Sequence, residues 1–309
     1  MKDKPVLLFP GQGSQKMGMG HDLVEKDPEL FDLYSQADDL LDSSISKLCF
    51  FGPQVKLDED LNAQLAIYVT TLVYFSFFKK QKVVPTIVAG HSMGFYAACV
   101  ASGTLTFEQG LKITKEAGLL TTSLFKGEEK GKMAAITGLT EAKVAQICRR
   151  IDPKGVFVAN INAPRQIVIS GLSGAVHKVV NQCIKEGALS AKQLKCDVPY
   201  HCPLLKEKSK RFGKFIDRTE IKDPVITIAN PFGKGYLKNS KEIRDALKKL
   251  LTSQIGWSDS IDSIVKDGYT QFVECGPGNV LSRLVKITCP KVKIIASQMQ
   301  WQETSFKRP

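Results

Sequence analysis

The sequence lacks several features that would assign it to particular classes of protein. No run of apolar residues reaches eighteen, and residues 1–5 lead into a short strand without the apolar core of a signal peptide. The eight cysteines form no Cys-x-x-Cys pair, and the four histidines show no metal-ligand spacing. We therefore expect a soluble, cytoplasmic protein with buried, reduced thiols and no metal.

The glycine-rich turn 11–15 (GQGSQ) is not a nucleotide-binding motif. It follows a predicted strand at 6–9, but it has neither the Lys-Ser/Thr of a P-loop nor the third glycine of a dinucleotide fingerprint. A glutamine flanked by glycines just after a strand can still bring its backbone close to a ligand. Gln12 is therefore a candidate for the functional site.

Acidic residues are fewer than basic ones, which gives the 309-residue chain a net charge of +12. An excess of this size suits an acidic partner, which could be nucleic acid, membrane phosphate or an acidic protein. The lysines are dispersed and have acidic residues between them, so a solvated basic surface accounts for them equally well. No nucleic-acid-binding motif is present.

One stretch, residues 87–98 (IVAGHSMGFYAA), combines an apolar strand, a tight turn and the start of a helix around Ser92. Glycines two residues before and two residues after the serine are typical of a nucleophile elbow, which exposes the hydroxyl at the carboxyl edge of a sheet. The following helix directs its free N–H groups at an oxyanion formed there. The alternative is a Gly-Ser loop that only caps a helix.

The order of predicted elements indicates an α/β fold with a mostly parallel sheet and an inserted domain. Helical patterns cover 22–48, 62–79 and 107–123, and a polar linker follows at 126–132. Beyond it we predict strand 133–137, helix 141–150, strands 156–161 and 166–170, helix 174–186 and strand 190–195. This βαββαβ order is that of a ferredoxin-like domain, which we place at 129–197 within a larger domain made of 1–128 and 198–309.

The larger domain resumes with a helix to about residue 216, a strand at 225–229, a helix at 240–251, a helix at Trp257 and a strand at 270–274. The last strand ends in Gly-Pro-Gly, which places another loop at the sheet edge that carries Ser92.

A serine nucleophile needs a general base, and histidine is the usual one near neutral pH. His21 opens an early helix, His91 adjoins Ser92 but projects away from it, and His177 lies on an exposed helix turn of the insertion. His201 lies between two prolines where the chain leaves the insertion, so it would face the cleft. Elimination selects His201, although a packed loop histidine would look the same.

Five ordered motifs together resemble the malonyl-CoA:acyl carrier protein transacylase family, from near residue 5 to near residue 295. They are 11–15 (GQGSQ), 90–94 (GHSMG), Asn162 with Gln166 and Ser170-Gly171, 198–202 (VPYHC), and 274–278 (ECGPG).

The resemblance implies an α/β-hydrolase-like large domain, a ferredoxin-like small one, and an acyl ester on Ser92 with His201 as base. It also implies an oxyanion hole from the backbone of Gln12 and Met93. Acyl-CoA and an acidic acyl carrier protein would be the substrates, with no cofactor, no nucleic acid or membrane, and a monomeric enzyme.

Three of the expected substrate-binding positions depart from the family pattern, and Asn162 is a fourth expected substrate-binding residue. Ala117 stands where malonyl-using members carry an arginine that binds the malonyl carboxylate. Tyr200 replaces a serine beside the histidine. Leu250 stands where the family has a glutamine. The backbone carbonyl at this position orients the histidine, and every residue has such a carbonyl. We therefore expect an uncharged acyl group in place of malonyl.

Three functions remain open on the sequence. The first is an acyltransferase of fatty-acid or polyketide synthesis, which passes acyl groups to a carrier protein. The second is a hydrolase of the same fold that clears acyl groups from carrier proteins with water. A carrier-protein-binding module without catalysis is the third, and the presence of both Ser92 and His201 disfavours it.

Overall fold

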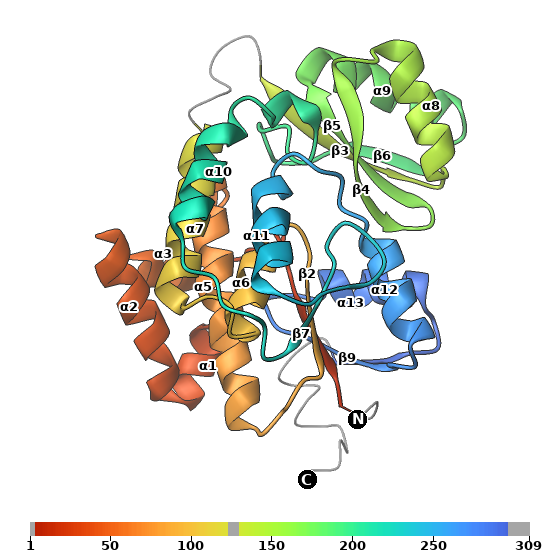
Figure 1. Ribbon diagram of the computed structural model, residues 1–309. Coiled ribbons are helices and arrows are strands. Elements are labelled where there is room, and N and C mark those ends of the chain that lie inside the picture. The colour runs from red at the N-terminus through yellow and green to blue at the C-terminus, as the bar shows by residue number, and fades with distance from the viewer. Residues whose placement is uncertain (1–3, 123–129, 296–309) are drawn as a thin grey trace.

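The fold is built on two sheets, one in each of two layered units (Figure 1). The computed structural model describes residues 4–122 and 130–295. The larger sheet has the strand order β10-β9-β1-β2-β7-β8 and is parallel except for β8. Its strands are β1 (Val6–Phe9), β2 (Ile87–Gly90), β7 (Thr227–Ala229), β8 (Tyr236–Leu237), β9 (Gln271–Glu274) and β10 (Lys293–Ile295). The prediction of a mostly parallel α/β sheet is confirmed.

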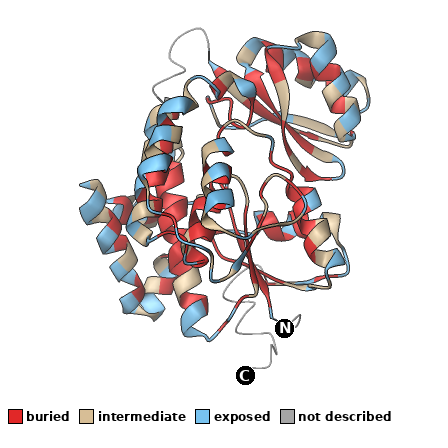
Figure 2. Cartoon of the chain, in the orientation of Figure 1, coloured by how far each residue is buried: buried red, intermediate tan, exposed pale blue. Residues whose placement is uncertain are grey.

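Helices cover both sides of this sheet, and the buried residues gather between them and the strands (Figures 1 and 2). On one side lie α5 (Asp60–Lys80), α6 (Gly94–Ala101) and α7 (Phe107–Thr122), and on the other α12 (Trp257–Lys266) and α13 (Val280–Thr288). Helix α5 is long and apolar enough to cross a membrane, but 78% of its apolar stretch is buried inside the protein. It is therefore the central core helix of the large unit.

The second sheet has the order β4-β5-β3-β6 and is antiparallel. Its elements are β3 (Gly131–Thr137), α8 (Glu141–Ile151), β4 (Val156–Ala163), β5 (Gln166–Leu172), α9 (Ser173–Lys185) and β6 (Ser190–Gln193). This order and topology are those of a ferredoxin-like unit. We keep 129–197 as the proposed limits of the insertion. Part of the predicted linker (126–129) and the predicted helix end at Ser123 lie outside the described residues.

Several predicted elements are shorter or more divided than the sequence suggested. The helix predicted over 22–48 is divided into α1 (His21–Lys26), η1 (Pro28–Leu30), α2 (Phe31–Leu41) and α3 (Ile45–Phe51). Pro28 begins a new turn because it lacks an N–H, and Asp42 ends α2 in the left-handed region with φ of 51°. The short elements α4 (Gln54–Leu57), β8 and β10 were not predicted.

The chain after the second sheet returns across the large unit through η2 (Pro203–Leu205), α10 (Ser209–Arg218) and α11 (Ser240–Lys249). The two units are joined by backbone hydrogen bonds between β4 and the segment that precedes α12. Ile255 donates to Ala159 at 2.8 Å and accepts from Ile161 at 2.8 Å. The second sheet is thereby held over the carboxyl edge of the first.

Candidate active site

Ser92 lies at the turn between β2 and α6 in a strained backbone conformation. Its φ is 54°, in the left-handed region that a residue with a side chain seldom adopts. A Cβ on Gly94 would lie 2.1 Å from the carbonyl oxygen of Phe9, and one on Gly90 would lie 2.4 Å from the backbone nitrogen of Phe95. Both positions therefore require glycine, which explains the spacing of the motif around the serine.

The Gln12 turn lies directly beside the serine turn because β1 and β2 are paired neighbours. Phe9 pairs with Gly90, and the N–H of His91 donates to the Phe9 carbonyl at 3.0 Å. A Cβ on Gly11 would lie 2.7 Å from the carbonyl oxygen of His91 and 3.3 Å from the Cβ of Ser92. The backbone of residues 11–12 thus approaches the nucleophile as closely as sterics allow.

The third loop at this edge, the one predicted from Gly-Pro-Gly, is anchored by Glu274. Its buried carboxylate accepts from the backbone N–H groups of Leu281 and Ser282 and from the Ser282 hydroxyl. Burial raises the pKa of Glu274. A Cβ on Gly276 would lie 2.3 Å from the Pro10 ring, so this loop packs against the base of the Gln12 turn.

His201 is hydrogen-bonded to the serine and held from behind by a backbone carbonyl. Its Nε2 lies 2.7 Å from Ser92 Oγ and its Nδ1 lies 2.7 Å from the carbonyl oxygen of Leu250. A carbonyl oxygen only accepts, so Nδ1 carries the proton and Nε2 presents its lone pair to the serine hydroxyl. The structure thus brings together the two residues that elimination and the elbow motif selected separately.

The end of α11 explains why a main-chain oxygen is available to the histidine. The helix ends at Lys249, and the last carbonyls of a helix have no partner within it. The Leu250 carbonyl binds Nδ1 of His201, and the Leu251 carbonyl accepts from the His201 backbone N–H at 2.8 Å. Leu250 therefore acts on the histidine through its backbone, as the sequence predicts.

Burial keeps His201 neutral. The side chain is 4% exposed, and burial lowers its pKa to about 4, although the Leu250 carbonyl favours the protonated ring. Burial also lowers the pKa of His91, whose Nε2 lies 2.8 Å from the Asn162 side-chain oxygen. His91 thus points away from the serine and toward the second sheet.

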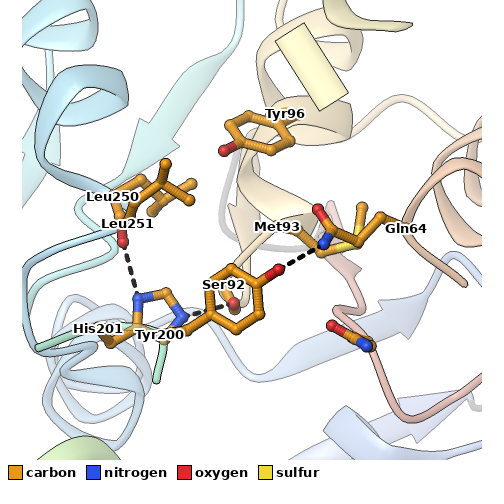
Figure 3. A pocket seen from close by; sticks show the side chains of 9 residues that line it. Gln64, Ser92, Met93, Tyr96, Tyr200, His201, Leu250 and Leu251 are labelled. Atoms are coloured by element: carbon orange, nitrogen blue, oxygen red, sulfur yellow. Dashed lines mark hydrogen bonds between the residues drawn. The ribbon is translucent and has the colours of Figure 1, made fainter. Parts of the chain in front are cut away.

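A cavity of about 20 Å³ adjoins Ser92 and His201 (Figure 3). Its wall combines polar groups, Gln12, Gln64 and the two tyrosines Tyr96 and Tyr200, with the apolar side chains Met93, Leu250 and Leu251. The Tyr96 hydroxyl is buried and has no hydrogen-bond partner among the described residues. The space beyond the serine is sufficient only for a small group.

A larger cavity of about 540 Å³ lies between the two sheets and shares Gln12, Ser92, Tyr200 and His201 with the small one. Asn162 and Gln166 of the second sheet, Met133 and the Gln12 turn line it, and Lys195 lies at its wall. A long acyl donor can reach the serine through this cavity. Asn162, which the sequence predicts to bind substrate, lies at the wall of this larger cavity.

Ala117 and Tyr200 are linked through Thr121, whose hydroxyl oxygen lies 2.9 Å from the Ala117 carbonyl oxygen. Ala117 is fully buried on α7, and Thr121, one turn further on, lies with its hydroxyl oxygen 2.8 Å from the Tyr200 hydroxyl. The sequence analysis missed Asp60 and Gln64, which also bind Tyr200. No local motif marks them, because they approach Tyr200 only in the folded chain.

Comparison with known proteins agrees with this geometry. The family model described as "Acyl transferase domain" matches residues 6–305. The malonyl CoA-acyl carrier protein transacylase of Bacillus subtilis is 34% identical over 95% of this chain and 93% of its own length. A polyketide biosynthesis malonyl CoA-acyl carrier protein transacylase of the same organism, PksC, is 34% identical over 91% of this chain and 95% of its own length.

Solved structures show the same similarity. The malonyl CoA-acyl carrier protein transacylase of Coxiella burnetii has a TM-score of 0.91 and 33% identity, with 94% of this chain and 93% of that chain covered. A malonyl-transacylase solved in complex with a type II polyketide acyl carrier protein also has a TM-score of 0.91, at 28% identity over 95% of this chain and 96% of that chain.

Proposed function

The chain belongs to the acyl transferase domain family, and from that premise we propose that it moves an acyl group through an ester on Ser92 to the phosphopantetheine thiol of an acyl carrier protein. The observation that supports this proposal most strongly is the pair of hydrogen bonds that His201 makes, one to Ser92 Oγ and one to the Leu250 carbonyl oxygen, both at 2.7 Å. The reaction needs no cofactor beyond its two substrates.

In the first half-reaction His201 Nε2 takes the proton of the Ser92 hydroxyl as the oxygen attacks the thioester carbonyl of acyl-CoA. The negative charge on the carbonyl oxygen would be stabilised by the backbone N–H groups of Gln12 and Met93, which follow the paired strands β1 and β2. The carbon–sulfur bond breaks, and the histidine returns its proton to the departing thiolate. Free CoA and an acyl-serine ester result.

In the second half-reaction His201 takes the proton of the carrier-protein thiol as its sulfur attacks the ester carbonyl. The bond between the acyl carbon and Ser92 Oγ breaks, and the histidine returns the proton to the serine oxygen. The cavity of about 540 Å³ admits the pantetheine arm of either substrate to the same serine. The complex of a related transacylase with an acyl carrier protein supports this partner, and the net charge of +12 suits an acidic one. Ser92, His201 and the Leu250 carbonyl all come from one chain, so we propose that the enzyme acts as a monomer. We also propose that it is cytoplasmic.

We propose further that malonyl is not the preferred acyl group. Ala117 offers no cation to a carboxylate at the position where a malonyl-binding arginine is expected. A buried carboxylate without its partner costs about 2–5 kcal/mol. At about 1.4 kcal/mol per tenfold, this corresponds to a loss of roughly 30-fold to several-thousand-fold.

We expect acetyl-CoA or another uncharged acyl-CoA to acylate Ser92 at least about 30-fold faster than malonyl-CoA. Intact-protein mass spectrometry of the enzyme after brief mixing with each donor measures this directly, and peptide mapping locates the added acyl group. Rapid and complete loading from malonyl-CoA would contradict the proposed selectivity while leaving the acyl-serine mechanism in place.

A further inference from the structure

Asp60, the first residue of α5, connects the Gln12 turn with the wall of the small pocket. One carboxylate oxygen accepts from the Gln12 side-chain amide at 2.8 Å. The other accepts from the Gln64 amide at 3.0 Å and from the hydroxyl of Tyr200. Gln12, Gln64 and Tyr200 all line the cavity beside Ser92, so the carboxylate lies one side chain behind that wall. Figure 3 shows Gln64 and Tyr200 hydrogen-bonded to each other beside Ser92.

The Tyr200 hydroxyl is fully used inside this network. It donates to Asp60, accepts from the Gln64 amide at 2.8 Å and lies 2.8 Å from the Thr121 hydroxyl. Burial and the neighbouring Asp60 charge hold the pKa of Tyr200 well above its usual range, so the phenol remains a donor. Its one proton is given to Asp60, so it has no donor left for an acyl group in the pocket.

The donors that hold Asp60 are neutral: two amides, a phenol and the Cys196 thiol. Asp58, two residues earlier, differs in this respect because it pairs with Lys195 at 3.3 Å. Hydrogen bonds from neutral groups stabilise a carboxylate but leave its net charge in place. The negative charge therefore acts across the pocket wall, at about 5–7 Å from a group in the cavity, the length of two hydrogen-bond contacts.

We propose that Asp60 is a specificity-determining residue whose negative charge, relayed through the Gln64 and Tyr200 wall, excludes acyl groups that end in a carboxylate and admits small uncharged ones. This inference rests on the proposed acyl-serine mechanism and adds a second element to it. Ala117 only removes an attraction for malonyl, whereas Asp60 adds repulsion between like charges.

The test is the ratio of initial Ser92 acylation rates from malonyl-CoA and acetyl-CoA in the wild type, Asp60→Asn and Tyr200→Phe. Asp60→Asn removes the charge and keeps the shape, and the Gln12 amide can reverse to pair with the new amide. We expect the malonyl-to-acetyl ratio to rise about tenfold to 100-fold, the effect of one unit charge at this range. Tyr200→Phe is the matched control: it alters the same network but keeps the charge, so the ratio should stay within about threefold of the wild type.

Because both rates come from one preparation, partial misfolding of a variant lowers them together and leaves the ratio unchanged. A ratio that rises equally in both variants would show that the hydrogen-bond network and not the charge of Asp60 excludes malonyl, and the proposal would be wrong. A ratio that rises in neither variant would also overturn it. Failure of every acyl-CoA to label wild-type Ser92 would instead contradict the proposed function itself, so the two failures are separate.

Discussion

Replacing Ser92 with alanine should abolish acyl-enzyme formation and lower acyl transfer by about 10⁴-fold to 10⁶-fold. The covalent intermediate needs the serine oxygen, and its neighbours cannot supply one. His91 points toward Asn162, and Met93 carries no nucleophile. Intact-protein mass spectrometry after mixing with acyl-CoA should show no mass increase for Ser92→Ala.

The fold of this variant should remain intact. Alanine keeps the Cβ that serine already places at φ of 54°, so the substitution introduces no new backbone strain. The thermal unfolding midpoint should therefore stay close to that of the wild type. Undiminished transfer by a folded Ser92→Ala protein would refute the assignment of the nucleophile.

His201→Ala should lower the rate of Ser92 acylation by about 10³-fold to 10⁵-fold. Without the imidazole the serine proton has no acceptor, because the Leu250 carbonyl lies behind the ring and not beside the serine. The matched control is His177→Ala, which removes an exposed histidine of α9 and should leave the rate unchanged. A wild-type rate in His201→Ala, measured by rapid-quench acylation, would exclude this residue as the base.

The pH dependence of the wild type tests the same assignment without mutation. His201 acts as a base only when it is neutral, and burial lowers its pKa to about 4. A lowered pKa means that the neutral form persists as the pH falls, so acylation should be constant from about pH 8 to pH 5 and decline only near pH 4. A half-maximal rate near the ordinary histidine value of about 6.5 would contradict the burial argument. Recovery of the full rate on return to pH 7 separates titration from acid denaturation.

Much of this architecture was predictable because local patterns determine it. The glycines around Ser92 predicted the elbow, and the structure shows the backbone contacts that require Gly90 and Gly94. The alternation of strands and helices over 133–195 predicted the βαββαβ unit, whose strands pair in the ferredoxin-like order. The mostly parallel sheet is likewise confirmed.

Other features could not be predicted because they arise from contacts between distant segments. The Asp60 carboxylate meets Tyr200 from 140 positions away in the sequence, and Gln64 meets it from 136. Neither residue belongs to a motif, so only the folded chain shows that they surround the acyl pocket. Asn162 was predicted to bind substrate, but only the fold shows that it lines the larger cavity, with its side-chain oxygen 2.8 Å from His91 Nε2. The roles assigned to the site residues stay predictions until the variants are measured.

If Ser92 carries an acyl group between two thiols, the fate of that group distinguishes a transferase from a hydrolase. Acyl-enzyme is formed from a labelled, uncharged acyl-CoA and separated from the remaining acyl-CoA. It is then mixed with buffer alone, with apo-acyl carrier protein or with holo-acyl carrier protein. For a transferase we expect the ester to remain stable in buffer and with the apo-protein. With the holo-protein, the label should move rapidly to the carrier protein, one acyl group for each acylated Ser92. Release of free acid at the same rate in all three mixtures would contradict this expectation and identify a hydrolase.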